Sequence, residues 1–223
     1  MTGSYEVRVT KSAGVRSFQV TLGERMTVLD ALFRIQSQQD SSLAFRCACR
    51  VGMCGTCAMY INKVPRLACK TRPAQLDSAV ISIAPLPHLP VIQDLVVSLG
   101  PFFDQWKRIK PALRGSGADT LAIIPPNPDT SRKRDCITCG ICYAACGIKA
   151  SHADYLGPAA INKAFLRLKD PRDSANKARL SVLNDEWSGV WRCHTQFNCT
   201  AACPKKIDLT DTIARIKRAM LTS

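Results

Sequence analysis

The N-terminal part of the chain alternates between apolar and polar positions, which is the pattern of half-buried strands. Residues 6–10 and 17–22 follow this pattern on either side of a turn that contains glycine, and they predict a β-hairpin. Apolar segments at residues 58–61 and 79–83 predict further strands. We therefore expect a small sheet within the first hundred residues.

A helix is expected directly after the hairpin. Thr27 and Asp30 have the spacing of a capping box, which marks the beginning of a helix. The residues that then fall on one helical face are Leu29, Leu32, Phe33 and Gln36. A helix packed on a hairpin gives this region a mixed α+β character.

A proline-rich segment at residues 85–90 interrupts the pattern, and its three prolines exclude regular structure. We interpret it as a boundary that divides the chain into domains at residues 1–90 and 91–223, and we interpret His88 as a linker residue.

Apolar residues beyond the boundary recur with helical spacing. One stripe consists of Ile92, Leu95, Val96 and Leu99, and the next of Phe102, Trp106 and Ile109. Residues 114–134, rich in Gly, Pro and polar residues, predict an irregular connection. Further helices are predicted after Gly157, at residues 176–183 and after Asp208. In the last of these, Ile213, Ile216 and Met220 are expected to face inward, and Arg215, Lys217 and Arg218 outward. The second domain should be helical throughout.

Twelve cysteines provide the strongest chemical signal. Cys136, Cys139, Cys142 and Cys146 have the spacing C-x2-C-x2-C-x3-C, by which ferredoxin-type chains bind a cubane iron–sulfur cluster and send the last thiolate to a neighbouring cluster. A second run repeats this frame as C-x2-Q-x2-C-x3-C-P, in which Gln196 replaces one cysteine. The thiols of the second run belong to Cys193, Cys199 and Cys203.

Exchange of the last cysteine between the two runs defines two sets of ligands. The set expected for a [4Fe-4S] cluster is Cys136, Cys139, Cys142 and Cys203. The other set, Cys146, Cys193 and Cys199, lacks a thiolate at Gln196. Because a cubane with one unligated corner readily exists as a three-iron cluster, we expect [3Fe-4S] there. A pair of zinc knuckles is disfavoured, because the triple C-x2-C-x2-C crowds too many thiolates for one zinc ion.

A third constellation lies in the N-terminal domain. Cys49, Cys54, Cys57 and Cys69 follow C-x4-C-x2-C-x11-C, the plant-type [2Fe-2S] spacing, with glycines at positions 52 and 55 that allow close approach of the backbone. The expected fold is a β-grasp ferredoxin domain followed by an all-α, ferredoxin-like domain with two cubane-type clusters. Cys47 is surplus, and we interpret it as a packed thiol.

Charge and length add limits on location and partners. The 223 residues carry a net charge of +14 and contain no apolar run long enough to span a bilayer. The N-terminus has neither a signal h-region nor an Arg-rich presequence, so we expect no signal or transit peptide and a reducing compartment. A basic surface suits an acidic partner subunit or anionic lipid. Nucleic acid is the least favoured partner, because the chain has no helix-turn-helix or zinc-finger signature.

The order of these features resembles the iron–sulfur subunit of succinate dehydrogenase and fumarate reductase, respiratory complex II. The resemblance includes the segments Cys193-His194-Thr195 and Cys203-Pro204-Lys205. It implies a separate flavoprotein subunit that interconverts succinate and fumarate at FAD, and membrane-anchor subunits that hold a quinone. This chain would carry electrons between FAD and quinone through the three clusters. It would be peripheral on the cytoplasmic face of the cell membrane.

The resemblance also implies two candidate quinone contacts, His194 and Lys217. The structural alternatives are a histidine that only hydrogen-bonds the backbone and a lysine that is only solvated. The segment after Cys146 lacks a Trp that lines the ubiquinone pocket in many succinate dehydrogenases, and is more similar to the fumarate reductase branch. Ubiquinone and menaquinone, and both directions of turnover, therefore stay open.

Two further functions are compatible with the cysteine motifs: the electron-transfer subunit of another flavoprotein oxidoreductase, and a free multi-cluster ferredoxin. The chain has no nucleophile paired with a base and no dinucleotide fingerprint. We therefore expect no catalytic residue here, and substrate chemistry on a separate subunit.

Overall fold

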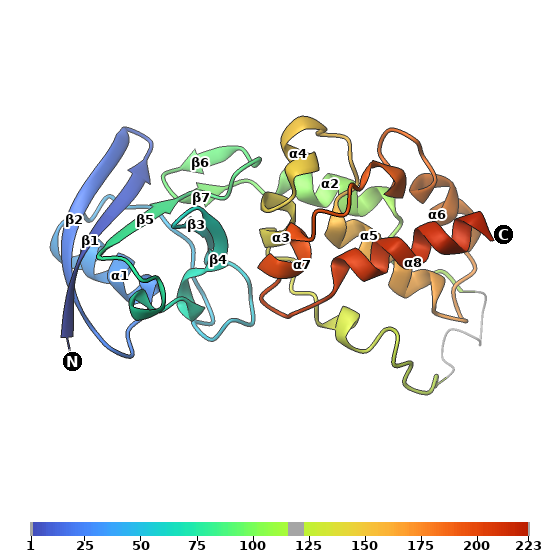
Figure 1. Ribbon diagram of the computed structural model, residues 1–223, viewed down its shortest axis with the longest axis horizontal. Coiled ribbons are helices and arrows are strands. Elements are labelled where there is room, and N and C mark those ends of the chain that lie inside the picture. The colour runs from blue at the N-terminus through green and yellow to red at the C-terminus, as the bar shows by residue number, and fades with distance from the viewer. Residues whose placement is uncertain (1, 116–122, 223) are drawn as a thin grey trace. The chain divides into compact units, whose positions relative to one another are not determined.

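The computed structural model describes residues 2–115 and 123–222 of the chain. It contains two compact units, shown in Figure 1. The first takes the chain up to Leu99 together with Cys139–Ala144, and the second takes Gly100–Thr138 and the chain from Ala145 onward. The predicted domain boundary between residues 90 and 91 stays a prediction.

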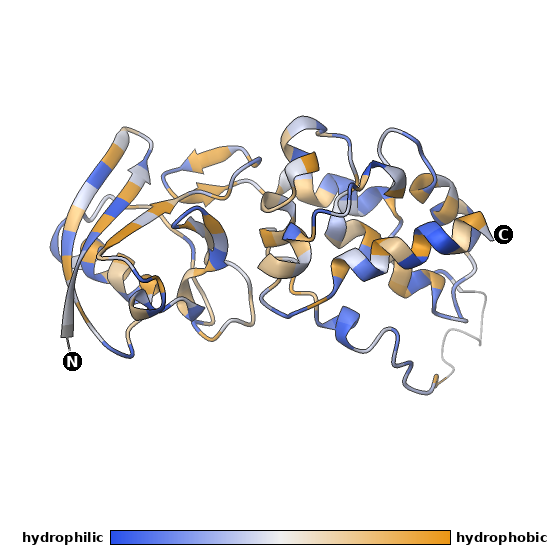
Figure 2. Cartoon of the chain, in the orientation of Figure 1, coloured by the Kyte–Doolittle hydropathy of each residue, from blue (hydrophilic) through white to orange (hydrophobic). Residues whose placement is uncertain are grey.

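A five-stranded sheet forms the centre of the first unit, in the order β2-β1-β5-β3-β4. Its strands are β1 (Thr2–Lys11), β2 (Gly14–Gly23), β3 (Ala58–Ile61), β4 (Val64–Leu67) and β5 (Val80–Ala84). β1 pairs antiparallel with β2 and parallel with β5. Figure 2 shows the alternation of apolar and polar residues along β1 and β2. The predicted hairpin and the two later strands are confirmed.

Helix α1 (Val28–Gln38) begins with the predicted capping box between Thr27 and Asp30. It buries Leu29 and Leu32 as predicted, but Val28, Ala31 and Ile35 complete the buried face, and Phe33 and Gln36 are only half-buried. The Phe33 ring instead packs edge-to-face against the Phe45 ring, with 5.2 Å between the ring centres. The Arg50 guanidinium lies 4.4 Å from the centre of the Phe33 ring. Phe33 therefore joins the helix to the loop that carries the first cysteines.

The stripe at residues 92–99 does not form the predicted helix. The chain forms a small hairpin there, with β6 (Val91–Gln93) and β7 (Val96–Val97). Asp94 stands at its turn with a φ of 46° and is only 4% exposed. Its carboxylate accepts hydrogen bonds of 2.9 Å from the backbone N–H groups of Ser12 and Ala44. These contacts, distant in sequence, outweigh the local helical periodicity.

The second unit is helical, as predicted. Its helices are α2 (Gly100–Arg108), α4 (Gly147–Ser151), α5 (Pro158–Leu168), α6 (Asn176–Leu183), α7 (Asn198–Ala202) and α8 (Leu209–Leu221). Short 3₁₀ turns occur at Arg132–Asp135 and Val190–Arg192. Helix α3 (Ile141–Ala144) lies in the segment that groups with the first unit. The core of the second unit includes Ile161, Ala164 and Phe165 of α5 and Ile213 and Ile216 of α8.

A buried ion pair fixes helix α6. The side chains of Arg179 and Asp173 are both 0% exposed and form an ion pair. The same guanidinium donates to the carbonyl oxygens of Ile109, Lys110 and Ala112, at distances of 2.8 to 3.1 Å. Since a buried charge needs full pairing, this arrangement holds α6 against the segment after α2. The predicted irregular connection at residues 114–134 lies partly outside the described residues.

Candidate iron–sulfur cluster sites

The loop that carries Cys49 and Cys54 is shaped by positive φ angles. Gly52 and Gly55 have φ values of 77° and 75°. A Cβ atom on Gly52 would lie 2.9 Å from Cγ of Lys70, so this glycine is favoured by space as well as by conformation. The turn directs the N–H groups of Met53 and Cys54 to the sulfur of Cys49, at 3.2 and 3.3 Å.

Cys57 and Cys69 complete this group. Cys57 precedes β3, and Cys69 lies in the 3₁₀ turn Ala68–Lys70 after β4. The hydrogen bond from Ala68 N to Cys57 O, 3.0 Å long, joins the two segments. Cys69 contacts Cys57 through its backbone and its thiol, and Cys54 contacts Cys49. All four cysteines of the plant-type spacing therefore form one connected group, while Cys47 is half-buried next to the loop.

The protein treats these thiols differently. Backbone N–H groups, that of Val51 first, lower the pKa of Cys49. The hydrogen bond with the Thr56 hydroxyl, at 3.1 Å, is the main reason that the pKa of Cys54 falls to about 6. Burial raises the pKa of Cys57 to about 12. Because iron binds the thiolate, the lowered pKa values of Cys49 and Cys54 favour these two cysteines as ligands. The thiol of Cys57 keeps its proton until a metal displaces it.

Three cysteines of the second unit gather around one cavity. Cys146, Cys193 and Cys199 line it together with Tyr155 and Gln196. The thiols also lie close enough to interact electrostatically, and burial raises the pKa of Cys199 to about 11. The Thr210 hydroxyl lies 3.8 Å from the sulfur of Cys199. This is the set predicted to hold the three-iron cluster, and the structure brings its members together.

The two cysteine runs share a backbone conformation. Thr138 and Thr195, each two residues after the first cysteine of its run, have φ values of 52° and 56°. Gly140 and Phe197, four residues after it, have values of 78° and 60°. Gln196 therefore stands in the second run where Cys139 stands in the first. A bulky residue at positive φ is strained, so Phe197 indicates how strongly the loop geometry is imposed.

The remaining cubane set is divided between segments. Cys136 and Cys203 belong to the second unit. Burial is the main reason that the pKa of Cys136 is raised, and the neighbouring Cys203 raises it further, while a hydrogen bond from the backbone of Thr138 opposes them. The N–H of Ile207 donates to the sulfur of Cys203 at 3.4 Å. Cys139 and Cys142 lie in the segment Cys139–Ala144, which groups with the first unit. Their assignment with Cys136 and Cys203 stays a prediction.

The two candidate quinone contacts differ in their surroundings. His194 is exposed at the rim of the cavity that Cys193 and Cys199 line. Lys217 on α8 was expected to face outward, but it is half-buried. Its ammonium donates to the carbonyl oxygen of Cys193 at 2.8 Å and lies 5.8 Å from the centre of the Trp191 ring. The interpretation of Lys217 as an only solvated residue is therefore wrong.

Sequence reasoning missed two polar residues next to the three-cysteine cavity. Tyr155 is 1% exposed, and burial raises its pKa well above the ordinary value. Lys149 is 4% exposed, and burial lowers its pKa to about 8. Its ammonium donates to the carbonyl oxygens of Ala153 and, at 2.8 Å, of Tyr155. Tyr155 had no sequence signal, and the only signal for Lys149 was its place between Ile148 and Ala150, three residues after Cys146.

The donor set fits iron–sulfur clusters. Cysteine sulfurs receive N–H groups from the backbone, which is how proteins surround cluster sulfurs, and the buried Tyr155 hydroxyl has no hydrogen-bond partner among the described residues. Among those same residues, no group of three His, Cys, Asp or Glu side chains is placed to hold one metal ion. When bound, such clusters accept and donate single electrons.

Within residues 2–115 and 123–222, no helix has the length and hydropathy needed to cross a membrane.

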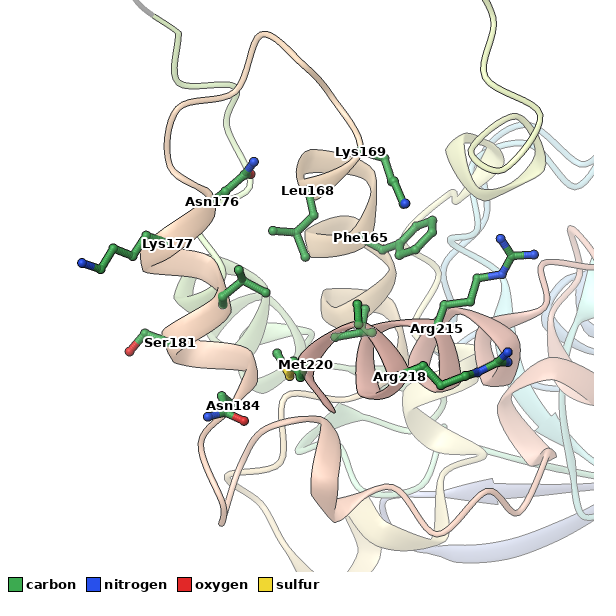
Figure 3. A pocket seen from close by; sticks show the side chains of 13 residues that line it. Phe165, Leu168, Lys169, Asn176, Lys177, Ser181, Asn184, Arg215, Arg218 and Met220 are labelled. Atoms are coloured by element: carbon green, nitrogen blue, oxygen red, sulfur yellow. The ribbon is translucent and has the colours of Figure 1, made fainter. Parts of the chain in front are cut away.

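A separate groove of about 800 Å³ lies between α5, α6 and α8 (Figure 3). Phe165, Leu168 and Met220 contribute apolar surface, and Lys169 and Arg218 are basic residues among those that line it. None of the described residues that line the groove is a cysteine. The sequence pattern did not predict the groove, because one of its walls comes from α8, which is distant along the chain from α5 and α6.

Two protein families match this chain. Residues 4–104 match the family described as a 2Fe-2S iron–sulfur cluster binding domain. Residues 133–207 match the family described as a 4Fe-4S dicluster domain. These matches confirm the predicted α+β architecture of a [2Fe-2S] ferredoxin domain followed by a helical dicluster domain.

Similar proteins cover most of the chain. It is 39% identical to the mitochondrial succinate dehydrogenase (ubiquinone) iron–sulfur subunit of Candida glabrata, over 86% of this chain and 78% of that protein. It is 41% identical to iron–sulfur subunit 1 of mitochondrial succinate dehydrogenase (ubiquinone) from Oryza sativa subsp. japonica, over 87% and 71%.

Solved structures agree in fold. A chain of the Mycobacterium smegmatis Sdh1 complex in the apo form superposes with a TM-score of 0.89 at 26% identity, covering 100% of this chain and 97% of that one. A hypothetical protein from Helicobacter pylori superposes with a TM-score of 0.59 at 13% identity over 99% of this chain and 40% of that one, a likeness of fold alone.

Proposed function

The chain belongs to the family of succinate dehydrogenase iron–sulfur subunits, and from this premise we propose how its residues serve that function. The protein is the electron-transfer subunit of a succinate:quinone oxidoreductase. It holds [2Fe-2S], [4Fe-4S] and [3Fe-4S] clusters, and its partners are an FAD-containing flavoprotein subunit and membrane-anchor subunits. Substrate chemistry takes place on the flavoprotein.

The observation that carries the residue assignment is the gathering of Cys146, Cys193 and Cys199 around a cavity also lined by Gln196. Three thiols and a neutral amide suit a cluster that lacks one iron corner. We assign [3Fe-4S] to these three cysteines. We assign [2Fe-2S] to Cys49, Cys54, Cys57 and Cys69. We assign [4Fe-4S] to Cys136, Cys139, Cys142 and Cys203.

The quinone end belongs to the same region of the second unit. His194 lies at the rim of the three-cysteine cavity, and Lys217 contacts the backbone of Cys193. A quinone that accepts electrons from the three-iron cluster has to come close to it, so we propose both residues as quinone contacts. Residues 1–90 and 91–223 are the corresponding domains of our proposal.

The subunit is a peripheral part of a membrane-associated complex, and we propose the cytoplasmic face of the cell membrane as its place. The formal charge of +14 is suited to an acidic partner surface or to anionic headgroups. Protease protection in sealed vesicles of known orientation tests this location. Digestion of the subunit only in vesicles that expose the opposite face would contradict it.

Low-temperature electron paramagnetic resonance of the intact complex tests the function and the clusters together. We expect an oxidised [3Fe-4S] signal that disappears with succinate, and [2Fe-2S] and [4Fe-4S] signals on further reduction with dithionite. Clusters that respond to dithionite but not to succinate would indicate another flavoprotein oxidoreductase. A chain that elutes alone on gel filtration, with all clusters and no membrane association, would indicate a free ferredoxin.

A further inference from the structure

The hydroxyl of Tyr155 is one of the buried polar groups of the second unit that the described part of the fold leaves without a partner. The residue is 1% exposed, and its oxygen has no hydrogen-bond partner among the described residues. A buried hydroxyl without a partner is costly, and buried tyrosines normally find one. Its position therefore indicates that its partner is a sulfur of the neighbouring cysteines or of a group bound by them.

The surroundings of this hydroxyl are sulfur-rich. Tyr155 lines the same cavity as Cys146, Cys193 and Cys199, and all three thiols lie close enough to affect it electrostatically. The thiol of Cys193 is the group that comes nearest to hydrogen-bonding geometry with the hydroxyl. A cluster bound by these cysteines would bring additional sulfur acceptors into the same cavity.

The backbone of Tyr155 is held on three sides, which fixes the direction of its side chain. Its N–H donates to the carbonyl of His152 at 3.2 Å, and its own carbonyl accepts from Lys149 at 2.8 Å. The next N–H, that of Leu156, donates to Ser188 at 2.8 Å. The ring belongs to the buried core that includes Ile213. A ring held in this way does not turn its hydroxyl out to solvent.

The hydroxyl also keeps its proton. An ordinary tyrosine hydroxyl has a pKa of about 10, so the group is a donor throughout the physiological pH range. An O–H donor next to a cluster stabilises the form with more negative charge, which is the reduced form. A phenylalanine would fill the same space without this dipole.

We propose that the Tyr155 hydroxyl donates a hydrogen bond to a sulfur of the cluster held by Cys146, Cys193 and Cys199, and thereby raises the reduction potential of that cluster. The inference rests on the proposed assignment of these three ligands. One electron enters the cluster and no bond is formed or broken in the protein. The tyrosine retains its proton in both oxidation states.

The first test is Tyr155→Phe in the assembled complex, with the potential of the [3Fe-4S] signal titrated by electron paramagnetic resonance. We expect the ratio of reduced to oxidised cluster at a fixed potential to fall about tenfold, which corresponds to about 59 mV for one electron. The oxidised signal should also lose its coupling to one exchangeable proton. Ile213→Val is the matched control, because it removes an apolar group from the same cavity wall and should leave the potential and the coupling unchanged.

A second test retains the ring and the fold. Replacement of Tyr155 by 3-fluorotyrosine makes the hydroxyl a stronger donor, so the potential should rise. A potential that is unchanged in both Tyr155 replacements, or an exchangeable coupling that persists in Tyr155→Phe, would overturn the proposal. Absence of the [3Fe-4S] signal from the wild-type complex would instead reject the proposed ligands.

Discussion

Lys217 offers a direct test of what supports the three-cysteine cavity. Its ammonium donates to the Cys193 carbonyl at 2.8 Å and lies 5.8 Å from the centre of the Trp191 ring. Lys217→Met retains most of the apolar stem and removes both interactions. A hydrogen bond from a charged group contributes about 1.5–3 kcal/mol, and a cation–π contact at a half-exposed site about 0.5–1 kcal/mol. The segment at Cys193 should therefore be destabilised by about 2–4 kcal/mol.

Local opening of this segment is measurable by hydrogen exchange. A loss of about 2–4 kcal/mol corresponds to an increase of about 30- to 700-fold in the open population. We expect the peptide that covers Cys193 to exchange faster in Lys217→Met by a factor in this range, while peptides from the first unit are unchanged. The measurement is made on the intact complex by mass spectrometry. Lys217→Arg keeps the charge and should recover part of the protection.

Arg218→Met is the matched control, because Arg218 is the next residue of α8, is exposed, and lines the groove away from the cysteines. Its exchange pattern should match that of the wild type. Equal protection at Cys193 in Lys217→Met and Arg218→Met would refute the positioning role. A loss of quinone reductase activity in Lys217→Met without faster exchange would leave quinone contact as the only role of the residue.

Three further substitutions test other parts of the structure. Arg179→Met breaks the fully buried ion pair with Asp173 and should lower the free energy of unfolding by about 3–5 kcal/mol, measured by denaturant titration. An unchanged midpoint would contradict the buried pairing. Arg172→Met, which removes a more exposed ion pair, is the control and should have no measurable effect. Cys49→Ser should remove or weaken the [2Fe-2S] signal alone, and a signal of full intensity would contradict the ligand assignment. Gln196→Cys should convert [3Fe-4S] toward [4Fe-4S] and lower its potential; an unchanged resonance spectrum would count against the proposed cavity.

The elements that the sequence predicted well are those whose signals are local. The alternation in β1 and β2, the capping box before α1 and the proline at the beginning of α5 each act within a few residues. The cysteine spacings are local in the same sense, because each one is a pattern within a short segment of the chain. These features could therefore be read without knowing the rest of the fold.

The predictions that failed concern segments whose structure depends on contacts with residues distant in sequence. The stripe at residues 92–99 has helical spacing, yet the carboxylate of Asp94 binds backbone N–H groups far away in sequence and turns the segment into a hairpin. The helical periodicity of α8 predicts that Lys217 faces outward, but in the fold its ammonium donates to the carbonyl oxygen of Cys193. Tyr155 has no motif at all, because only the folded chain brings it to the cysteine sulfurs.

The two cysteine runs share one backbone frame but differ in the charge of the side chains that the frame carries. The frame fixes the positions of the side chains, so a difference in function has to come from their charge. Gln196 places a neutral amide where the first run has a thiolate, and its oxygen lies 2.8 Å from the position of a Cβ on Gly147. Lys149 adds a buried cation that interacts with Cys146, and Lys217 places a second cation at the Cys193 carbonyl. Each of these features reduces the negative charge around the three-cysteine site, and less negative charge makes a cluster easier to reduce. This charge distribution supports our proposal that the three-cysteine site holds the electron acceptor closest to the quinone.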